Sequence, residues 1–138
     1  MVDERIKTLA KNLVNYSMKV KKGDNVYIHY VGPTTQMLAK QLVKEVYAVG
    51  GNPFPHFTDP IVEREMLLNC TEEQLKVMAE TDAAEMSKMD CYVGIRGTDN
   101  VTEYSDVPAE KMKLYSSLYS TPVHHDIRVP KTRWVVLR

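Results

Sequence analysis

Cys91-Tyr-Val-Gly-Ile95 is the clearest strand signal in the chain. The segment has no charged residue and is almost continuously apolar. A strand of this kind is typical of a parallel sheet that other elements cover on both faces. We therefore predict a buried strand over residues 91–95, and we expect the rest of the chain to supply its neighbours and the covering helices.

Three further segments predict strands, at residues 25–31, 53–58 and 132–137. Pro55 cannot donate a ladder hydrogen bond, which favours the edge of the sheet for its strand. Helical segments separate the four strands, so the strands can pair in parallel through right-handed crossovers. The predicted fold is a flavodoxin-like, three-layer α/β domain, an open parallel sheet of about four strands with helices on both faces. We predict the strand order 2-1-3-4.

Two helices are predicted in the first fifty residues. The first begins after an N-cap at Asp3, runs to about residue 20 and ends before Gly23. The second is capped by Thr34 or Thr35, runs to about residue 49 and stops at Gly50-Gly51, where one glycine is expected to be left-handed. The positions expected to face the core are Ile6, Leu9, Ala10, Leu13, Val14 and Ser17 in the first helix and Leu38, Leu42, Val46 and Val49 in the second.

Three more helices are predicted further along the chain. Asp59 is the expected cap, and Pro60 the first residue, of a short helix near residues 61–68. Thr71 and Gln74 have the spacing of a capping box for a longer helix that runs to about residue 89. The last helix begins at Pro108 and has Met112, Tyr115 and Tyr119 in register.

Length and charge restrict the class of protein. The chain has 138 residues, and its 18 Lys and Arg residues balance its 18 Asp and Glu residues. This length predicts one α/β domain over residues 1–138, and zero net charge disfavours nucleic acid as a partner. No apolar run approaches the ~20 residues of a membrane span, and the N-terminus lacks the pattern of a signal peptide. We expect a cytoplasmic protein, without a membrane partner, that keeps Cys70 and Cys91 as buried thiols.

The histidines do not form a recognisable metal motif. His124-His125-Asp126 is the densest candidate, but adjacent residues rarely aim at one point, and H-E-x-x-H and paired C-x-x-C motifs are absent. His29 and His56 lie on predicted strands, where we expect half-buried or surface imidazoles. We therefore expect no metal site formed by these residues.

Other catalytic signatures are missing as well. Gly94 and Gly97 have a G-x-x-G spacing, but the third glycine and the following Lys-Ser/Thr of a phosphate-binding loop are absent. The chain has no G-x-S-x-G nucleophile elbow. Cys91 has no partner base nearby in the sequence, which favours a structural thiol. We predict no catalytic residue in this chain.

The ends of the predicted strands are the best candidates for ligand contact. Ligands of open parallel sheets bind beyond the carboxyl ends of the strands, which here are residues 31–33, 58–59 and 96–100. Arg96 is the most suggestive of these residues, because an arginine can hold a carboxylate through two hydrogen bonds. Asp59 is the second candidate, although helix capping explains this residue better than ligand contact does.

Five segments, taken in order, resemble blocks of a known enzyme family. They are Asn15-Tyr-Ser-Met-Lys-Val-Lys-Lys-Gly-Asp24, Ala48-Val-Gly-Gly-Asn-Pro53, Ile95-Arg-Gly-Thr-Asp-Asn100, Asp106-Val-Pro-Ala-Glu-Lys-Met112 and Arg133-Trp-Val-Val-Leu-Arg138. Together they are similar to the N-terminal domain of the aminopeptidase T / aminopeptidase S family, the thermophilic-type metallo-aminopeptidases. The resemblance covers nearly the whole chain.

This resemblance implies a cytoplasmic, dimeric exopeptidase that removes N-terminal residues from peptides. The family uses two divalent metal ions, zinc, cobalt or similar, to polarise the scissile carbonyl and activate a bridging water. The resemblance places their ligands in a C-terminal domain beyond this sequence, so no metal ligand or catalytic residue is carried over to a residue here. The implied partners are the peptide substrate, the protein's own C-terminal domain and a second copy of the chain.

Two interpretations remain open at this point. The strand predicted over residues 132–137 ends the sequence without a covering helix, so we expect an N-terminal, non-catalytic fragment of a longer two-domain enzyme that is inactive alone. The alternative is a stand-alone flavodoxin-like module that binds a small molecule or serves regulation.

Overall fold

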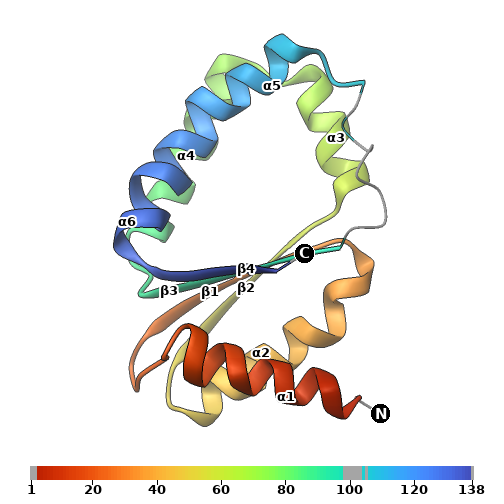
Figure 1. Ribbon diagram of the computed structural model, residues 1–138. Coiled ribbons are helices and arrows are strands. Elements are labelled where there is room, and N and C mark those ends of the chain that lie inside the picture. Colours follow the sequence, from red (N-terminus) through yellow and green to blue (C-terminus); the bar gives the residue numbers. More distant parts are fainter. Residues whose placement is uncertain (1–2, 98–103, 105, 138) are drawn as a thin grey trace.

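A computed structural model describes residues 3–97, 104 and 106–137 of the chain. Helices lie on both faces of a central sheet (Figure 1). The elements are α1 (Glu4–Asn12), η1 (Leu13–Ser17), β1 (Asn25–Val31), η2 (Pro33–Thr35), α2 (Gln36–Ala48), β2 (Asn52–Thr58), α3 (Pro60–Asn69), α4 (Glu72–Met86), β3 (Cys91–Arg96), α5 (Ala109–Tyr115), η3 (Ser116–Arg128), α6 (Val129–Lys131) and β4 (Arg133–Leu137). None of the helices within those ranges is long and apolar enough to cross a membrane.

The four strands form one parallel sheet with the order β2-β1-β3-β4. This confirms the predicted α/β class and the order 2-1-3-4. β2, which contains Pro55, lies at one edge as predicted, and β4 lies at the other. β3 is buried over Cys91–Ile95 as its apolar composition predicted, and only Arg96 at its carboxyl end is partly exposed.

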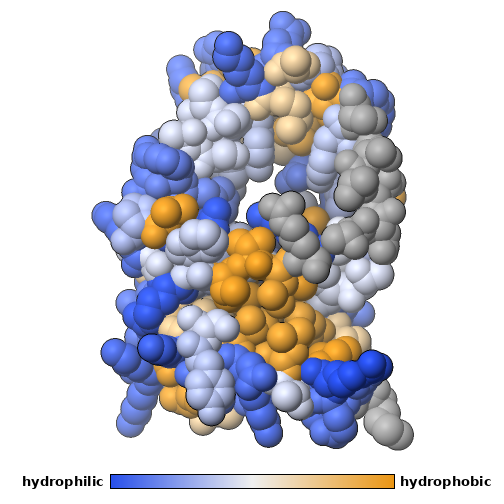
Figure 2. All heavy atoms as spheres, in the orientation of Figure 1, coloured by the Kyte–Doolittle hydropathy of each residue, from blue (hydrophilic) through white to orange (hydrophobic). Residues whose placement is uncertain are grey.

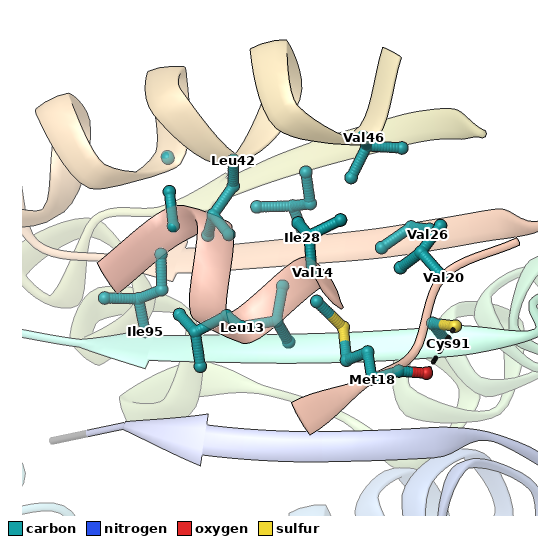
Figure 3. Packing of buried hydrophobic residues seen from close by; sticks show 13 residues of the cluster. Leu13, Val14, Met18, Val20, Val26, Ile28, Leu42, Val46, Cys91 and Ile95 are labelled. Carbon is teal, nitrogen blue, oxygen red and sulfur yellow. Dashed lines mark hydrogen bonds between the residues drawn. The ribbon is translucent and has the colours of Figure 1, made fainter. Parts of the chain in front are cut away.

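One face of the sheet, which we call the packed face, is covered by α1, η1 and α2. Their apolar side chains interdigitate with those of β1 and β3 in one cluster (Figure 3). The fully buried members include Val14 and Met18 from the first helical segment, Leu42 and Val46 from α2, and Ile28 from β1. The Cys91 thiol belongs to this cluster and lies 3.8 Å from the Met18 carbonyl oxygen.

The first helix ends earlier than predicted, because it changes to π-helical hydrogen bonding. The Met18 amide donates to the Leu13 carbonyl at 2.9 Å, one residue further back than in an α-helix. The wider turn moves the buried position from Ser17, which is exposed, to Met18. The helix therefore ends at Ser17 rather than near residue 20, and Lys19 adopts a positive φ of 50°.

The other face, which we call the arch face, carries α3, α4, α5, η3 and α6. α3 rises from the carboxyl end of β2, whereas α4 and the long segment from α5 to α6 lie side by side near the start of β3 and β4, at the opposite end of the strands (Figure 1). The two arms meet where α3 contacts α5. Figure 2 shows an opening between this arch and the sheet.

The predicted caps of the arch helices are present. Asp59 accepts a hydrogen bond from the Ile61 amide at 3.0 Å, and Thr71 Oγ1 accepts one from the Gln74 amide at 3.1 Å. α4 ends at Met86 rather than near residue 89. The helix predicted from Pro108 continues to Lys131 as α5, η3 and α6, and Pro122 lies inside its π-helical part. Proline has no amide hydrogen, so an altered hydrogen-bond pattern accommodates it inside a helix.

Candidate functional site

The arch face of the sheet carries a row of flat rings, which we call the aromatic floor. Side chains alternate between the two faces along a strand, so the parallel register places Tyr27, His29, His56 and Tyr92 on the same face. The Tyr27 ring stacks on His56 at 4.3 Å between centroids and on Tyr92 at 5.4 Å. Polar, ring-bearing side chains therefore line the middle of the sheet beneath the arch.

Both ring nitrogens of His29 take part in hydrogen bonds within this floor. Nε2 lies 2.7 Å from Thr58 Oγ1, and Nδ1 lies 3.2 Å from the Tyr92 hydroxyl oxygen. Burial first, and then the nearby charge of Arg96, lower the pKa of His29 to about 4. The imidazole is therefore neutral at pH 7, with one N–H donor and one acceptor nitrogen.

η3 places a second imidazole and an arginine over the floor. Arg128 Nε donates to Nδ1 of His124 at 3.0 Å, so this nitrogen of His124 is the acceptor. The Arg128 guanidinium carbon lies 4.7 Å from the centre of the Tyr92 ring and 5.0 Å from that of Trp134. These distances are within the range of cation–π contacts. Burial, followed by the charge of Arg128, lowers the pKa of His124 to about 4.

Arg96, at the carboxyl end of β3, lies on the same face of the sheet as Tyr92, because alternate residues of a strand face the same side. Its charge contributes to the lowered pKa values of His29, His124 and Arg128, although burial is the largest cause for each of them. We call Arg96 and Arg128 the arginine pair. Within the described residues, neither guanidinium forms an ion pair with a carboxylate, and Nη1 of Arg128 is buried without a hydrogen-bond partner.

The acidic side chains of the arch have partners of their own. Glu85 Oε2 lies 2.9 Å from His56 Nε2, and Asp82 accepts a hydrogen bond from the Tyr119 hydroxyl. The Tyr104 hydroxyl donates to Glu63 at 2.7 Å. Among the contacts of the described residues, these three carboxylates therefore pair with His56, Tyr119 and Tyr104 and not with the arginine pair.

The structure separates the two candidates that the sequence placed at the strand ends. Arg96 lies with the histidines of the arch face, as described above. The Asp59 carboxylate caps α3, so its observed role is structural. Residues 98–100, which completed the third predicted strand end, lie outside the described part of the chain.

Sequence reasoning missed most of this cluster. His29 and His56 are half-buried, which agrees with the expectation of half-buried or surface imidazoles, but their contacts within the floor were not predicted. Tyr92 and Arg128 were not among the candidates. Two signals could have found them. Tyr92 and His29 interrupt otherwise apolar strands on one face, and Arg128 follows His124 at the i, i+4 spacing of neighbours on a helix.

The described residues do not suit a divalent metal. They contain no group of three or more His, Cys, Asp or Glu side chains that could hold one ion. In His124-His125-Asp126, His124 contacts Arg128, whereas the exposed His125 contacts Asp126 at 3.2 Å. Consecutive residues point in different directions along a helix, which explains this divergence. The arginine pair would also repel a cation at the neutral imidazoles.

The fold and the site together define a doubly wound α/β domain with a basic, aromatic cavity at the carboxyl side of its sheet. Residues 2–138 match the thermophilic metalloprotease (M29) family. The chain therefore belongs to this family of metal-dependent peptidases, which confirms the family resemblance found in the sequence.

The comparison with solved structures finds one match that shares the fold, and a second with a lower TM-score. Wild-type AmpT from Thermus thermophilus superposes with a TM-score of 0.71 at 19% sequence identity, and the match covers 97% of this chain and 35% of that one. The crystal structure of CurK enoyl reductase gives a TM-score of 0.45 at 12% identity, with coverage of 96% and 42%. No curated protein matches the chain. The chain spans about a third of the length of the AmpT structure, so nearly two thirds of AmpT has no counterpart here.

Proposed function

We propose that this chain is a non-catalytic, N-terminal α/β domain, formed by residues 1–138, of a metal-dependent aminopeptidase that removes N-terminal amino acids from peptides. Membership of the M29 family carries the proposal, together with coverage of only 35% of the AmpT structure. The two divalent ions, zinc, cobalt or similar, would then be held by a C-terminal domain of the same protein. The complete enzyme would be a cytoplasmic homodimer without nucleic-acid or membrane partners.

In this proposal the arch face closes one side of the substrate cavity. Arg96 would face the peptide, because it lies at the carboxyl end of β3 and forms no ion pair with a carboxylate of the described residues. Asp59 is the second substrate-facing candidate, through the part of its carboxylate that capping leaves free. Neither residue would take part in bond cleavage.

Two measurements on the chain test this assignment. We expect no hydrolysis of unblocked peptides by residues 1–138 with added zinc or cobalt, and no stoichiometric tight site in calorimetric titrations with either ion. Peptidase activity that survives in the purified chain, or one tightly bound ion per chain, would overturn the non-catalytic role.

The coding sequence tests the alternative of a stand-alone binding module. We expect the reading frame to continue past codon 138 into a segment longer than this chain and rich in Glu, His and Asp. A stop codon directly after Arg138 would favour the stand-alone module, for which the basic, aromatic cavity would be the ligand site.

A further inference from the structure

The two guanidinium groups beneath the arch form no ion pair with a carboxylate of the described residues. Arg96 is the last residue of β3, on the same face of the sheet as Tyr92, and Arg128 is the last residue of η3. The nearby carboxylates Glu85, Asp82 and Glu63 contact His56, Tyr119 and Tyr104 instead. Two cations that share a partly buried space without a counterion favour the binding of an anion.

The geometry of Arg128 indicates which type of anion would bind. One face of its guanidinium lies against the Tyr92 and Trp134 rings, and Nε is bonded to His124. Nη1 is buried without a partner among the described residues. A planar guanidinium that is fixed on a ring and retains unused N–H groups is suited to a planar, two-oxygen acceptor, which is a carboxylate.

We propose that Arg96 and Arg128 bind the α-carboxylate of a short peptide above the aromatic floor. This inference rests on the proposed function, because that function brings peptides to the arch face. It also predicts the direction in which the peptide chain is bound. The arginine pair repels an N-terminal ammonium group and attracts the C-terminus, so the peptide's N-terminus points away from this domain.

The aromatic floor sets the surroundings of the bound carboxylate. The neutral imidazole of His124, whose Nδ1 accepts from Arg128, can donate a hydrogen bond from Nε2 without adding charge at pH 7. The flat rings of Tyr92 and Trp134 provide an apolar wall for the last side chain of the peptide. Short peptides with a free C-terminus are therefore the expected ligands, and peptide amides are not.

Trp134 provides the readout, because it is the chain's one tryptophan and lies 5.0 Å from the Arg128 guanidinium carbon. Trp134 fluorescence would be titrated in the 138-residue chain with trialanine, trialanine amide and inorganic phosphate. We expect trialanine to bind at least about tenfold more tightly than its amide, in line with the energy of a charged hydrogen bond. Phosphate should bind more weakly than trialanine.

Substitutions of the two arginines test whether they bind the carboxylate. Arg96→Gln and Arg128→Gln should each weaken the binding of trialanine about tenfold and leave the binding of trialanine amide unchanged. Arg128→Lys keeps the charge but loses the planar guanidinium, so this variant should weaken trialanine binding less. Arg5→Gln is the matched control, since Arg5 lies on α1 behind the packed face (Figure 1). Far-ultraviolet circular dichroism verifies that each variant is folded, and three independent substitutions keep the test valid if one fails.

The outcomes separate this inference from the proposed function. Equal binding of acid and amide, or no effect of any arginine substitution in the site, overturns the carboxylate pocket. Tighter binding of phosphate than of trialanine overturns the peptide assignment and indicates a free-anion site. Binding of trialanine by a chain whose reading frame stops after Arg138 supports the pocket and rejects the peptidase role.

Discussion

The two faces of the sheet have different roles in this molecule. The packed face is filled by apolar side chains from α1, η1 and α2, and many of them are fully buried (Figure 3). The arch face carries imidazoles, hydroxyls and two guanidinium groups, and its helices leave an opening above the strands (Figure 2). The arch face also has a buried apolar cluster, which includes Leu75 and Met86 of α4 and Val123 of η3. The comparison indicates that apolar packing stabilises both sides of the sheet, whereas the polar groups suited to binding gather on the arch face.

The largest expected effect is on the packed face. Leu42→Ala removes a fully buried side chain between α2 and the sheet, and should destabilise the fold by about 3 kcal/mol through lost burial and the remaining cavity. Urea denaturation measures this loss. Leu9→Ala is the matched control, because Leu9, which the helical pattern predicted to face the core, is 38% exposed and should cost less than about 1 kcal/mol. Equal losses at the two positions would contradict the role of buried apolar packing between α2 and the sheet.

Low pH should reduce the free energy of unfolding through two histidines of the arch face. The folded-state pKa values of His29 and His124 are about 4, below the usual 6.5. Between these values the unfolded chain binds more protons than the folded one, so the free energy of unfolding falls as the pH drops from 7 to 4. The histidine contribution should be on the order of 2 kcal/mol.

Denaturation curves at pH 7, 5.5 and 4.5 measure this dependence. His124→Gln should reduce the fall in stability between pH 7 and pH 4.5, because it removes one of the two groups. His125→Gln is the matched control, since His125 is exposed on the same helical segment. A pH dependence that is identical in all three proteins would show that His124 is not held neutral.

Substitutions of Asp59 distinguish helix capping from contact with the substrate. Asp59→Ala removes the cap of α3 and should cost about 1 kcal/mol of stability, whereas Asp59→Asn keeps an acceptor oxygen and should cost only a few tenths. Thermal unfolding measures both variants. If Asp59→Asn leaves stability intact but alters peptide binding, the carboxylate has a role beyond capping. If the stability losses of the two variants are equal, the side chain does not act through its cap.

Local patterns predicted the fold well. The apolar segment 91–95, Pro55 at an edge and the caps at Asp59 and Thr71 all depend on neighbouring residues, and the structure confirms each of them. The π-helical end of the first helix was missed, because it depends on how Met18 packs beside Cys91. Tertiary packing of this kind cannot be predicted from the spacing of apolar residues along the helix.

The candidate site was only partly predictable for a related reason. Arg96 follows directly from the rule that ligands bind at strand ends, and it lies in the cluster. The other members come together through the register of strands far apart in sequence, which pairs His29 with His56 and with Gly94. Arg128 reaches the floor only because the last helix continues past Pro122, a residue that normally ends helices.

The smallest expected effect concerns the contact between the arch and the edge strand. His56 and Glu85 connect β2 to α4 at 2.9 Å, but about a third of each side chain is exposed. Partly exposed ion pairs contribute little, so a double-mutant cycle with His56→Gln and Glu85→Gln should give a coupling below about 1 kcal/mol. Glu80→Gln, on the exposed side of α4, is the control for the change of charge. A coupling above about 2 kcal/mol would mean that this pair fixes the arch to the sheet, and that polar contacts stabilise the arch face in addition to its apolar cluster.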